Sequence, residues 1–179
     1  MLCSRGPMIT IDVEGRETTE TAIESIQKRY IGGRGVGTRV AHERIPFDAD
    51  PLGPANRLVF TTGPMQASNM SFTGRMNCTG ISPLTDGLLS SNAGGFMSRN
   101  FADTGYGAVE LTGASEELLA VHVRDDGVEF EEVNQLAGAT VPETVEYLES
   151  ERDITSDQTA VIGPAGENEV RFASIMTSE

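Results

Sequence analysis

The residues best suited to chemistry lie in one stretch rich in glycine and small polar side chains, TGPMQASNMSFTGRMNCTGISPLTDGLLSSNAGGFMSRN, at positions 62–100. Such a stretch can bring backbone N–H and C=O groups close to a bulky polar ligand. Gly94 and Gly95 precede the helical pattern FMSRNFA, so the first amides of that helix could serve an anion. The serines have no evident histidine partner for a nucleophilic triad. The stretch therefore favours a binding surface over a hydrolytic centre.

A second glycine cluster, RYIGGRGVGTRV at 29–40, comes close to the G-x-G-x-x-G fingerprint of dinucleotide-binding proteins. That fingerprint needs a strand before the glycines, because the pyrophosphate sits on the helix that follows them. Here the preceding residues, TAIESIQKRYI, have apolar side chains at helical spacing and a capping box of Thr21 and Glu24. We therefore predict a helix, a tight turn and a second helix rather than a nucleotide site.

Charge limits the class of partner. The chain has 179 residues, enough for one domain or at most two small ones. Its net charge of −14, from 27 acidic and 13 basic residues, argues against nucleic acid and anionic membranes, since both attract clustered Lys and Arg. Lys28 is the only lysine. The acidic excess is typical of a halophilic organism such as a halophilic archaeon, and a GC-rich genome is the alternative explanation for the arginines.

The remaining compositional features exclude further classes. No apolar run of about 18 residues and no signal-peptide core is present, which predicts a cytoplasmic protein with no membrane partner. Cys3 and Cys78 are too few and too far apart for a disulfide framework or a cysteine-rich metal site. His42 and His122 are isolated and have no ligand spacing.

Strand patterns outnumber helical ones along the chain. Apolar alternation and β-rich composition predict strands at 8–13, at 57–62 and across 71–82, the last interrupted by Gly74. The second half contains further short β-rich runs, and Asp126-Gly127 is a hairpin signal between two of them.

One helix stands out in the second half, at 140–151. Thr140 and Glu143 have the spacing of a capping box at its start. With the strands joined by hairpins, these elements predict the α+β class: a β-rich domain of mainly antiparallel, twisted sheets with a few helices, and not a doubly wound fold.

Five segments together resemble a known family: YIGGRGVGTRV, DPLGPANRLVFTTGPM, TGRMNCTGISPLTDGLLSSNAGGFM, GYGAVELTG and IGPAGENEVRFASIM. They occur in the same order and spacing as in the N-terminal domain of the aldehyde ferredoxin oxidoreductases, the tungsten-pterin enzymes. The resemblance implies that 1–179 is a single domain and the base for a tungsten bis-pterin (molybdopterin) cofactor. It also implies that the chain is truncated before the domains that hold a [4Fe-4S] cluster. The GGRG segment would then belong to the scaffold.

The same resemblance assigns roles to individual residues. Arg75, in TGRMN, matches the arginine that lies between the pterin and the cluster, where a planar group with several donors suits two partners. Asn92, in SSNAGG, matches the asparagine whose main-chain carbonyl holds a magnesium ion between the pterin phosphates. Ala93 and Gly94 match backbone contacts to the cofactor. Taken alone, Arg75 would be a surface arginine and Asn92 a helix N-cap.

The implied function is that of an oxidoreductase that converts a small aldehyde to a carboxylic acid and passes electrons to ferredoxin. Its partners would be the remaining domains or a downstream polypeptide, ferredoxin and, in a homodimer, a second copy. The chain has no C-x-x-C motif, so it should be inactive by itself. The alternative is a non-catalytic remnant or stand-alone scaffold from a truncated or split gene. Gly107 departs from the family, which usually has Asp there, at a structural position.

Overall fold

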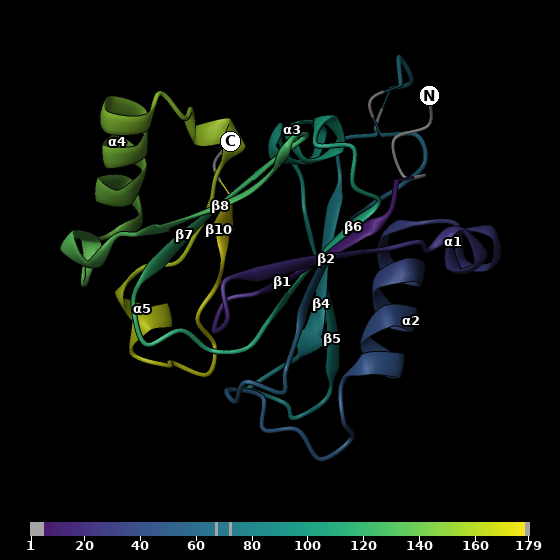
Figure 1. Cartoon of the computed structure of the whole chain (residues 1–179), viewed down its shortest axis with the longest axis horizontal. Coiled ribbons are helices and arrows are strands. Elements are labelled where there is room, and N and C mark those ends of the chain that lie inside the picture. The colour runs from purple at the N-terminus through teal and green to yellow at the C-terminus, as the bar shows by residue number, and fades with distance from the viewer. Residues whose placement is uncertain (1–5, 67, 72, 178–179) are drawn as a thin grey trace.

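A six-stranded sheet forms the centre of the structure (Figure 1), a computed structural model that describes residues 6–66, 68–71 and 73–177. The strands follow the order β2-β1-β6-β3-β4-β5. Their bounds are β1 Met8–Asp12, β2 Glu17–Thr21, β3 Leu58–Thr62, β4 Met76–Ile81, β5 Leu88–Ala93 and β6 Ala108–Thr112. Only β1 and β6 pair in parallel within this sheet, and the other neighbours are antiparallel. The predicted α+β class with a mainly antiparallel sheet is confirmed.

Two hydrophobic clusters cover the two faces of this sheet. Helices α1 (Glu24–Tyr30) and α2 (Gly33–Arg44) cover one face, on which Met8, Val59 and Ala108 meet helix residues such as Val36 and Val40. Because successive strand residues point to opposite faces, Ile9 and Val109 face the other way. There they meet α3 (Met97–Asp103) and the hairpin of β7 (Leu119–Arg124) and β8 (Gly127–Glu132).

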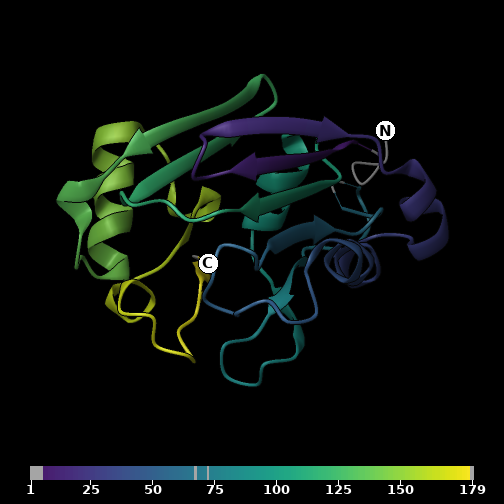
Figure 2. The ribbon, with the colours of Figure 1, turned by 60° about the horizontal axis from the view of Figure 1, so that its bottom comes forward.

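The β7–β8 hairpin lies beside the β1–β2 ribbon (Figure 2), where Arg16 of the β1–β2 turn pairs with Glu132 at 2.5 Å. Arg124 pairs with Gly127 in the register, so the hairpin turn is Asp125–Asp126 and Gly127 begins β8 with a φ of 141°. The predicted hairpin is confirmed, with its turn one residue earlier than Asp126-Gly127.

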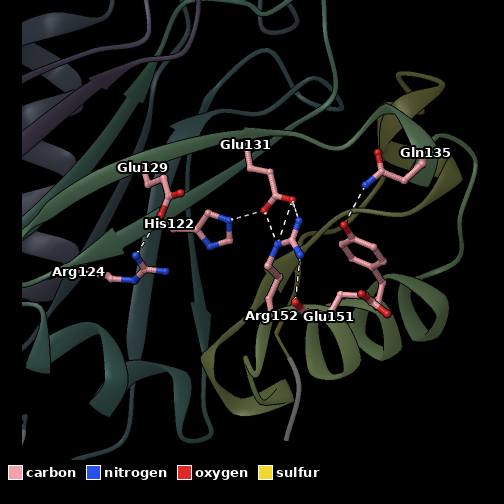
Figure 3. Close-up of polar contacts among 8 residues, drawn as sticks. His122, Arg124, Glu129, Glu131, Gln135, Glu151 and Arg152 are labelled. Carbon is pink, nitrogen blue, oxygen red and sulfur yellow. Dashed lines mark hydrogen bonds and ion pairs between the residues drawn. The ribbon is translucent and has the colours of Figure 1, made fainter.

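Helix α4 (Val141–Arg152) lies on the opposite side of the molecule from α1 and α2 (Figure 1). Its capping box of Thr140 and Glu143 is formed as predicted. Arg152, in the last turn of α4, donates hydrogen bonds to both carboxylate oxygens of Glu131 on β8. Glu131 also contacts His122 Nε2 at 3.0 Å (Figure 3). These contacts fasten the helix to the hairpin.

Short elements complete the C-terminal part of the described chain. These are 3-10 turns at Asn134–Leu136 and Ser156–Gln158, strand β9 at Ala160–Val161, helix α5 at Pro164–Glu167 and strand β10 at Met176–Thr177. Strands β9 and β10 pair with each other as a separate antiparallel ribbon.

The helix–turn–helix prediction at the second glycine cluster is confirmed, but the predicted capping box is wrong. Thr21 ends β2, where it pairs with Met8, and α1 begins after Ile23 without a side-chain cap. Strand β2 escaped the sequence analysis because its residues, ETTET, are all polar and mostly exposed. Ile31, which follows α1, has a φ of 71°, and Gly33, the first residue of α2, has one of 51°. The turn thus uses two left-handed residues, only one of them glycine.

Two boundaries around the first glycine-rich stretch also differ from expectation. Strand β4 begins at Met76, so Gly74 precedes the strand instead of interrupting it. Asn92 lies in β5 and is not a helix N-cap, since α3 begins after Phe96 with no side-chain cap. Asn92 pairs with Asn77 of β4 in the register. The local sequence favours Asn92 as a helix cap, but pairing with β4 places it in a strand instead.

Candidate functional site

A pocket with a volume of about 420 Å³ opens on the α2 side of the sheet, where the loop after β3 meets the start of β4 and the end of β5. It is lined by Gly33, Gly63, Pro64, Met65, Gln66, Met70, Ser71, Thr73, Arg75, Met76, Asn77 and Asn92. The sheet thus brings together Arg75 and Asn92, two of the four residues singled out in the sequence. Ala93 and Gly94 follow Asn92 at the end of β5 without being among the lining residues.

The electrostatics of this pocket differ from those of the chain as a whole. Acidic residues outnumber basic ones 27 to 13 in the sequence, yet the described lining contains Arg75 and no carboxylate. Arg75 is exposed, and its guanidinium makes no hydrogen bond or ion pair with any described residue. A free guanidinium presents several donors to an acceptor-rich or anionic group. The pocket is therefore suited to an anionic or acceptor-rich ligand.

Strands β4 and β5 form one wall of the pocket, and buried side-chain hydrogen bonds connect them. Asn77 is 2% exposed and donates from Nδ2 to the Ser91 carbonyl at 2.8 Å and to Asn92 Oδ1 at 3.3 Å. Thr79 donates its hydroxyl to Asn77 Oδ1 at 2.8 Å. The position of Asn92 at the pocket edge is thus set by a side chain of the neighbouring strand.

Helix α2 contributes to the same wall because it approaches the sheet closely. A Cβ on Gly37 would lie 2.7 Å from Thr79 Oγ1 and 3.0 Å from Asn77 Oδ1. Thr61 donates its hydroxyl to the Gly33 carbonyl at 2.9 Å, and Gly33 itself lines the pocket. The glycine cluster of α2 therefore serves close helix–sheet packing, in agreement with the scaffold interpretation.

Gly63 leaves open space at the pocket. A Cβ built on Gly63 meets no atom within 4 Å, and its φ lies outside the left-handed region. Gly63 lines the pocket, and it could carry a side chain there without backbone strain. The exposed Met65 and Met70 stand on the same loop, 39% and 58% exposed. The pocket thus combines open space, apolar side chains and a free cation.

A buried polar atom without a partner marks the same loop. Gln66 is 2% exposed, and its Oε1 has no hydrogen-bond partner among the described residues. Native structures rarely leave such an acceptor unpaired unless a ligand, ion or water completes it. Sequence analysis missed Gln66 and Asn77, because nothing in their local pattern separates them from other small polar residues of the stretch.

The other candidate residues lie outside this pocket. Cys78 is on β4 beside Asn77, and burial raises the pKa of its thiol to about 12, so it is no thiolate ligand near neutral pH. His42 packs edge-on against Phe47, and His122 contacts Glu131. Cys3 lies outside the described residues. Within the described part of the chain no group of three or more His, Cys, Asp and Glu side chains could hold a metal ion.

The helices of the described residues are all too short or too polar to cross a membrane.

Comparison with known proteins agrees with this architecture. The family model "Aldehyde ferredoxin oxidoreductase, N-terminal domain" matches residues 8–179. The tungsten-containing aldehyde ferredoxin oxidoreductase of Thermococcus kodakarensis is 34% identical over 162 residues, which are 90% of this chain and 27% of the relative. That of Pyrococcus horikoshii is 32% identical over 165 residues, or 92% of this chain and 27% of the relative. The chain thus spans about a quarter of the length of these relatives.

A solved structure shows the same fold. The active site complex BamBC of benzoyl coenzyme A reductase, in complex with 1,5-dienoyl-CoA, superimposes with a TM-score of 0.90 and 27% sequence identity. The match covers 98% of this chain and 27% of that one. Because the family model and the curated relatives agree, the chain belongs to the aldehyde ferredoxin oxidoreductase family and matches its N-terminal domain.

Proposed function

We propose that residues 1–179 form a single domain that cradles the tungsten bis-pterin cofactor of an aldehyde:ferredoxin oxidoreductase. The observation that carries this proposal is the pocket, which brings Asn92 together with Arg75 and has no carboxylate among its described lining residues; the Arg75 guanidinium has no partner among the described residues. The relatives named above are tungsten-containing enzymes. The open space around the Cβ position of Gly63, which lines the pocket, leaves room for a ligand of this kind.

The residues of the chain would divide the binding between them. Arg75 would donate hydrogen bonds to the pterin and, in the longer enzyme, to a [4Fe-4S] cluster. The main-chain carbonyl of Asn92 would hold a magnesium ion between the phosphates, with Ala93 and Gly94 as backbone contacts. When bound, the tungsten–pterin group supplies the redox chemistry that converts an aldehyde to a carboxylic acid, with electrons leaving through the cluster to ferredoxin. The chain alone should not oxidise aldehydes.

Filling the pocket tests its assignment directly. Gly63→Leu adds a side chain to a lining residue of the pocket without backbone strain, whereas Gly87→Leu adds the same side chain to an exposed loop. In the enzyme that contains this domain, tungsten and pterin per protein should fall several-fold in Gly63→Leu and stay unchanged in Gly87→Leu. Equal tungsten content in both variants would show that the cofactor lies elsewhere.

Arg75 is proposed to bind the cofactor through its side chain, whereas Asn92 is proposed to bind it through its main-chain carbonyl. Arg75→Ala should lower tungsten content or the cluster potential, because charge-assisted hydrogen bonds contribute about 1.5–3 kcal/mol. Arg75→Lys should restore only part of the tungsten content or cluster potential, because one ammonium group cannot contact two partners at once as a guanidinium does. Asn92→Ala keeps the main-chain carbonyl and should be milder. If Asn92→Ala proves the more damaging variant, the assignment of these two roles is wrong.

A further inference from the structure

A strained γ-turn joins α1 to α2 and leaves the side chain of Ile31 exposed. The Gly32 N–H donates to the Tyr30 carbonyl at 2.9 Å, and Ile31 between them has a φ of 71° and a ψ of −66°. A γ-turn with positive φ is rare and strained, above all at a β-branched residue. The Ile31 side chain is also 68% exposed, so burial does not offset this strain.

Three cations without ion pairs flank this turn. Lys28 and Arg29 lie in the last turn of α1, and Arg34 is the second residue of α2. All three are exposed and form no hydrogen bond or ion pair with any described residue, although Arg29 Cζ lies 5.7 Å from the centroid of the Tyr30 ring. By contrast, seven of the twelve described Lys and Arg residues are ion-paired: Arg16, Arg39, Arg44, Arg57, Arg124, Arg152 and Arg171.

The helix dipoles account for only part of this arrangement. Cations are favourable at the C-terminal end of a helix, so Lys28 and Arg29 can stabilise α1. Arg34 lies at the N-terminal end of α2, where a cation is unfavourable, and the first turn of α2 has no acidic residue to compensate it. The turn thus combines backbone strain, an exposed apolar side chain and an unfavourably placed cation. Features that lower stability in this way are typical of binding surfaces.

The charge of the chain is divided between two sides of the molecule. Residues 113–179, which include α4 and the β7–β8 hairpin, contain 16 acidic and 3 basic residues, whereas residues 1–112 contain 11 acidic and 10 basic ones. Helix α4 lies on the opposite side of the molecule from α1 and α2 (Figure 1). Salt screens exposed charges over about 10 Å at about 0.1 M ionic strength. A partner at the α1–α2 turn therefore experiences the local cations more strongly than the distant carboxylates.

An acidic protein matches this surface, which we call the α1–α2 patch and which consists of Lys28, Arg29, Ile31 and Arg34. Carboxylates of the partner would pair with the three cations around an apolar contact at Ile31. A nucleic acid matches less well, because three free cations neutralise at most three phosphates. A second copy would have to bring its acidic side to the patch. Since the two regions lie on opposite sides, such contacts would join copies head to tail.

The α1–α2 patch adjoins the pocket described above. Gly33 lines that pocket, and a Cβ on Gly32 would lie 3.2 Å from Cδ of Pro64, another lining residue. We propose that the patch docks a small acidic electron carrier, a ferredoxin. The cluster of a ferredoxin is itself anionic, because its cysteine thiolates outweigh the charge of the iron–sulfur core. The inference rests on the proposed function, since it takes the redox group to lie in the adjoining pocket.

Sedimentation of the full chain with oxidised ferredoxin from the source organism tests the docking surface. Visible absorbance follows ferredoxin alone, because only its cluster absorbs there. In about 0.15 M KCl, Lys28→Gln, Arg29→Gln and Arg34→Gln together should weaken binding about tenfold, the sum expected for three exposed ion pairs. The matched control removes the same charge from three exposed, ion-paired arginines elsewhere and should bind like the wild type. These arginines, each replaced by Gln, are Arg16, Arg124 and Arg171.

Ile31→Gly separates a binding role from a structural one. Glycine adopts a positive φ without strain, so this variant should melt at or above the wild-type temperature. It should nevertheless bind ferredoxin several-fold more weakly, because it removes the apolar contact. A lower melting temperature with unchanged binding would make Ile31 a purely structural residue.

Kinetics of the enzyme that contains this domain distinguish the inference from the proposed function. The triple-glutamine variant of the patch should raise the KM for ferredoxin and leave aldehyde oxidation with a viologen acceptor unchanged. If the wild-type enzyme oxidises no aldehyde with either acceptor, the proposed function fails and the ferredoxin assignment falls with it. If it reduces viologen but the variant keeps wild-type binding and KM, the proposed function stands and the docking role of the patch is overturned. Binding of a single-stranded oligothymidylate in place of ferredoxin, or self-association of the chain through the patch, would overturn the choice of partner.

Discussion

Thr79 donates its hydroxyl hydrogen to the side-chain oxygen of Asn77 across 2.8 Å, and both side chains are enclosed between α2 and the sheet. This contact orients the Asn77 amide, because an oxygen that accepts from Thr79 turns the nitrogen toward β5. There Asn77 donates to the Ser91 carbonyl at 2.8 Å. Thr79 therefore orients a residue that lines the pocket, although Thr79 itself is not among the lining residues.

Replacing this threonine should destabilise the fold measurably. Thr79→Val keeps the shape of the side chain but leaves Asn77 Oδ1 buried without a donor, which should cost about 1–3 kcal/mol of unfolding free energy. Urea unfolding measures this difference. Thr85→Val changes an exposed threonine and should stay within about 0.5 kcal/mol of the wild type. Equal stability of the two variants would mean that the Thr79 hydroxyl does not orient Asn77.

Gly37→Ala tests how closely α2 approaches the sheet. Alanine should favour the helix by about 1 kcal/mol over glycine, whereas overpacking of a buried contact costs about 1–3 kcal/mol. The added Cβ would meet Thr79 Oγ1 at 2.7 Å, so the second effect should win, with a net loss of about 1 kcal/mol. Gly87→Ala, whose Cβ meets its neighbours at 3.7 Å or more, is the control for chemical denaturation. A stabilised Gly37→Ala would show that the helix can move away without cost.

The contact between α4 and the hairpin should weaken in acid (Figure 3). The hydrogen-bonded guanidinium of Arg152, and secondarily His122, hold the pKa of the Glu131 carboxyl below its ordinary 4.5. Because the pKa is lower in the folded state, the stabilisation is present above the unfolded pKa and is lost as the pH falls through the folded one. Glu131→Gln should therefore melt below the wild type near neutral pH, and the difference should vanish in acid.

Melting temperatures between about pH 7 and about pH 3 measure this effect. Glu129→Gln, which removes an exposed carboxylate paired with Arg124, is the matched control on the same strand and should change little. A wild-type advantage over Glu131→Gln that is constant across the range would contradict the assigned ion pair.

Salt should stabilise the chain if its acidic composition reflects a halophilic origin. With a net charge of −14, self-repulsion opposes the compact state in dilute buffer, and screening relieves it. The melting temperature should rise from low salt to about 1 M KCl, and by a similar amount in NaCl, because screening depends on ionic strength. A flat or falling melting temperature would count against the proposed halophilic origin.

Local sequence patterns were enough for the elements whose signals are short-range. The alternation at 8–13, the hairpin near Asp126 and the capping box of Thr140 and Glu143 all appear in the structure. Each depends on residues within a few positions of one another, so local propensity and hydrophobic period coincide with the final fold. The boundaries failed where pairing across the sheet decided them, as for β2 and for Asn92.

Only part of the candidate site was predictable from the sequence. Family-like motifs pointed to Arg75 and Asn92, and the pairing of Asn77 with Asn92 brings their strands together. Gln66 and Thr79 carry no local signal. The partner of Gln66 is Ser98, 32 residues away. Thr79 and Asn77 are only two residues apart on β4, but they become buried only when α2 packs against the sheet.

By itself, the sequence determined the α+β class, the acidic character and the resemblance to a family, because these follow from composition, period and ordered motifs. Only the tertiary structure decided that α2 packs closely on polar residues of the sheet and that the described residues lining the pocket include no carboxylate. It also decided that the buried amide oxygen of Gln66 has no partner among the described residues. The physical reason is that hydrogen-bond satisfaction and burial are properties of non-local neighbours. The sequence specifies the chemical identity of each side chain, whereas its hydrogen-bond partners depend on which residues the packed sheet brings next to it.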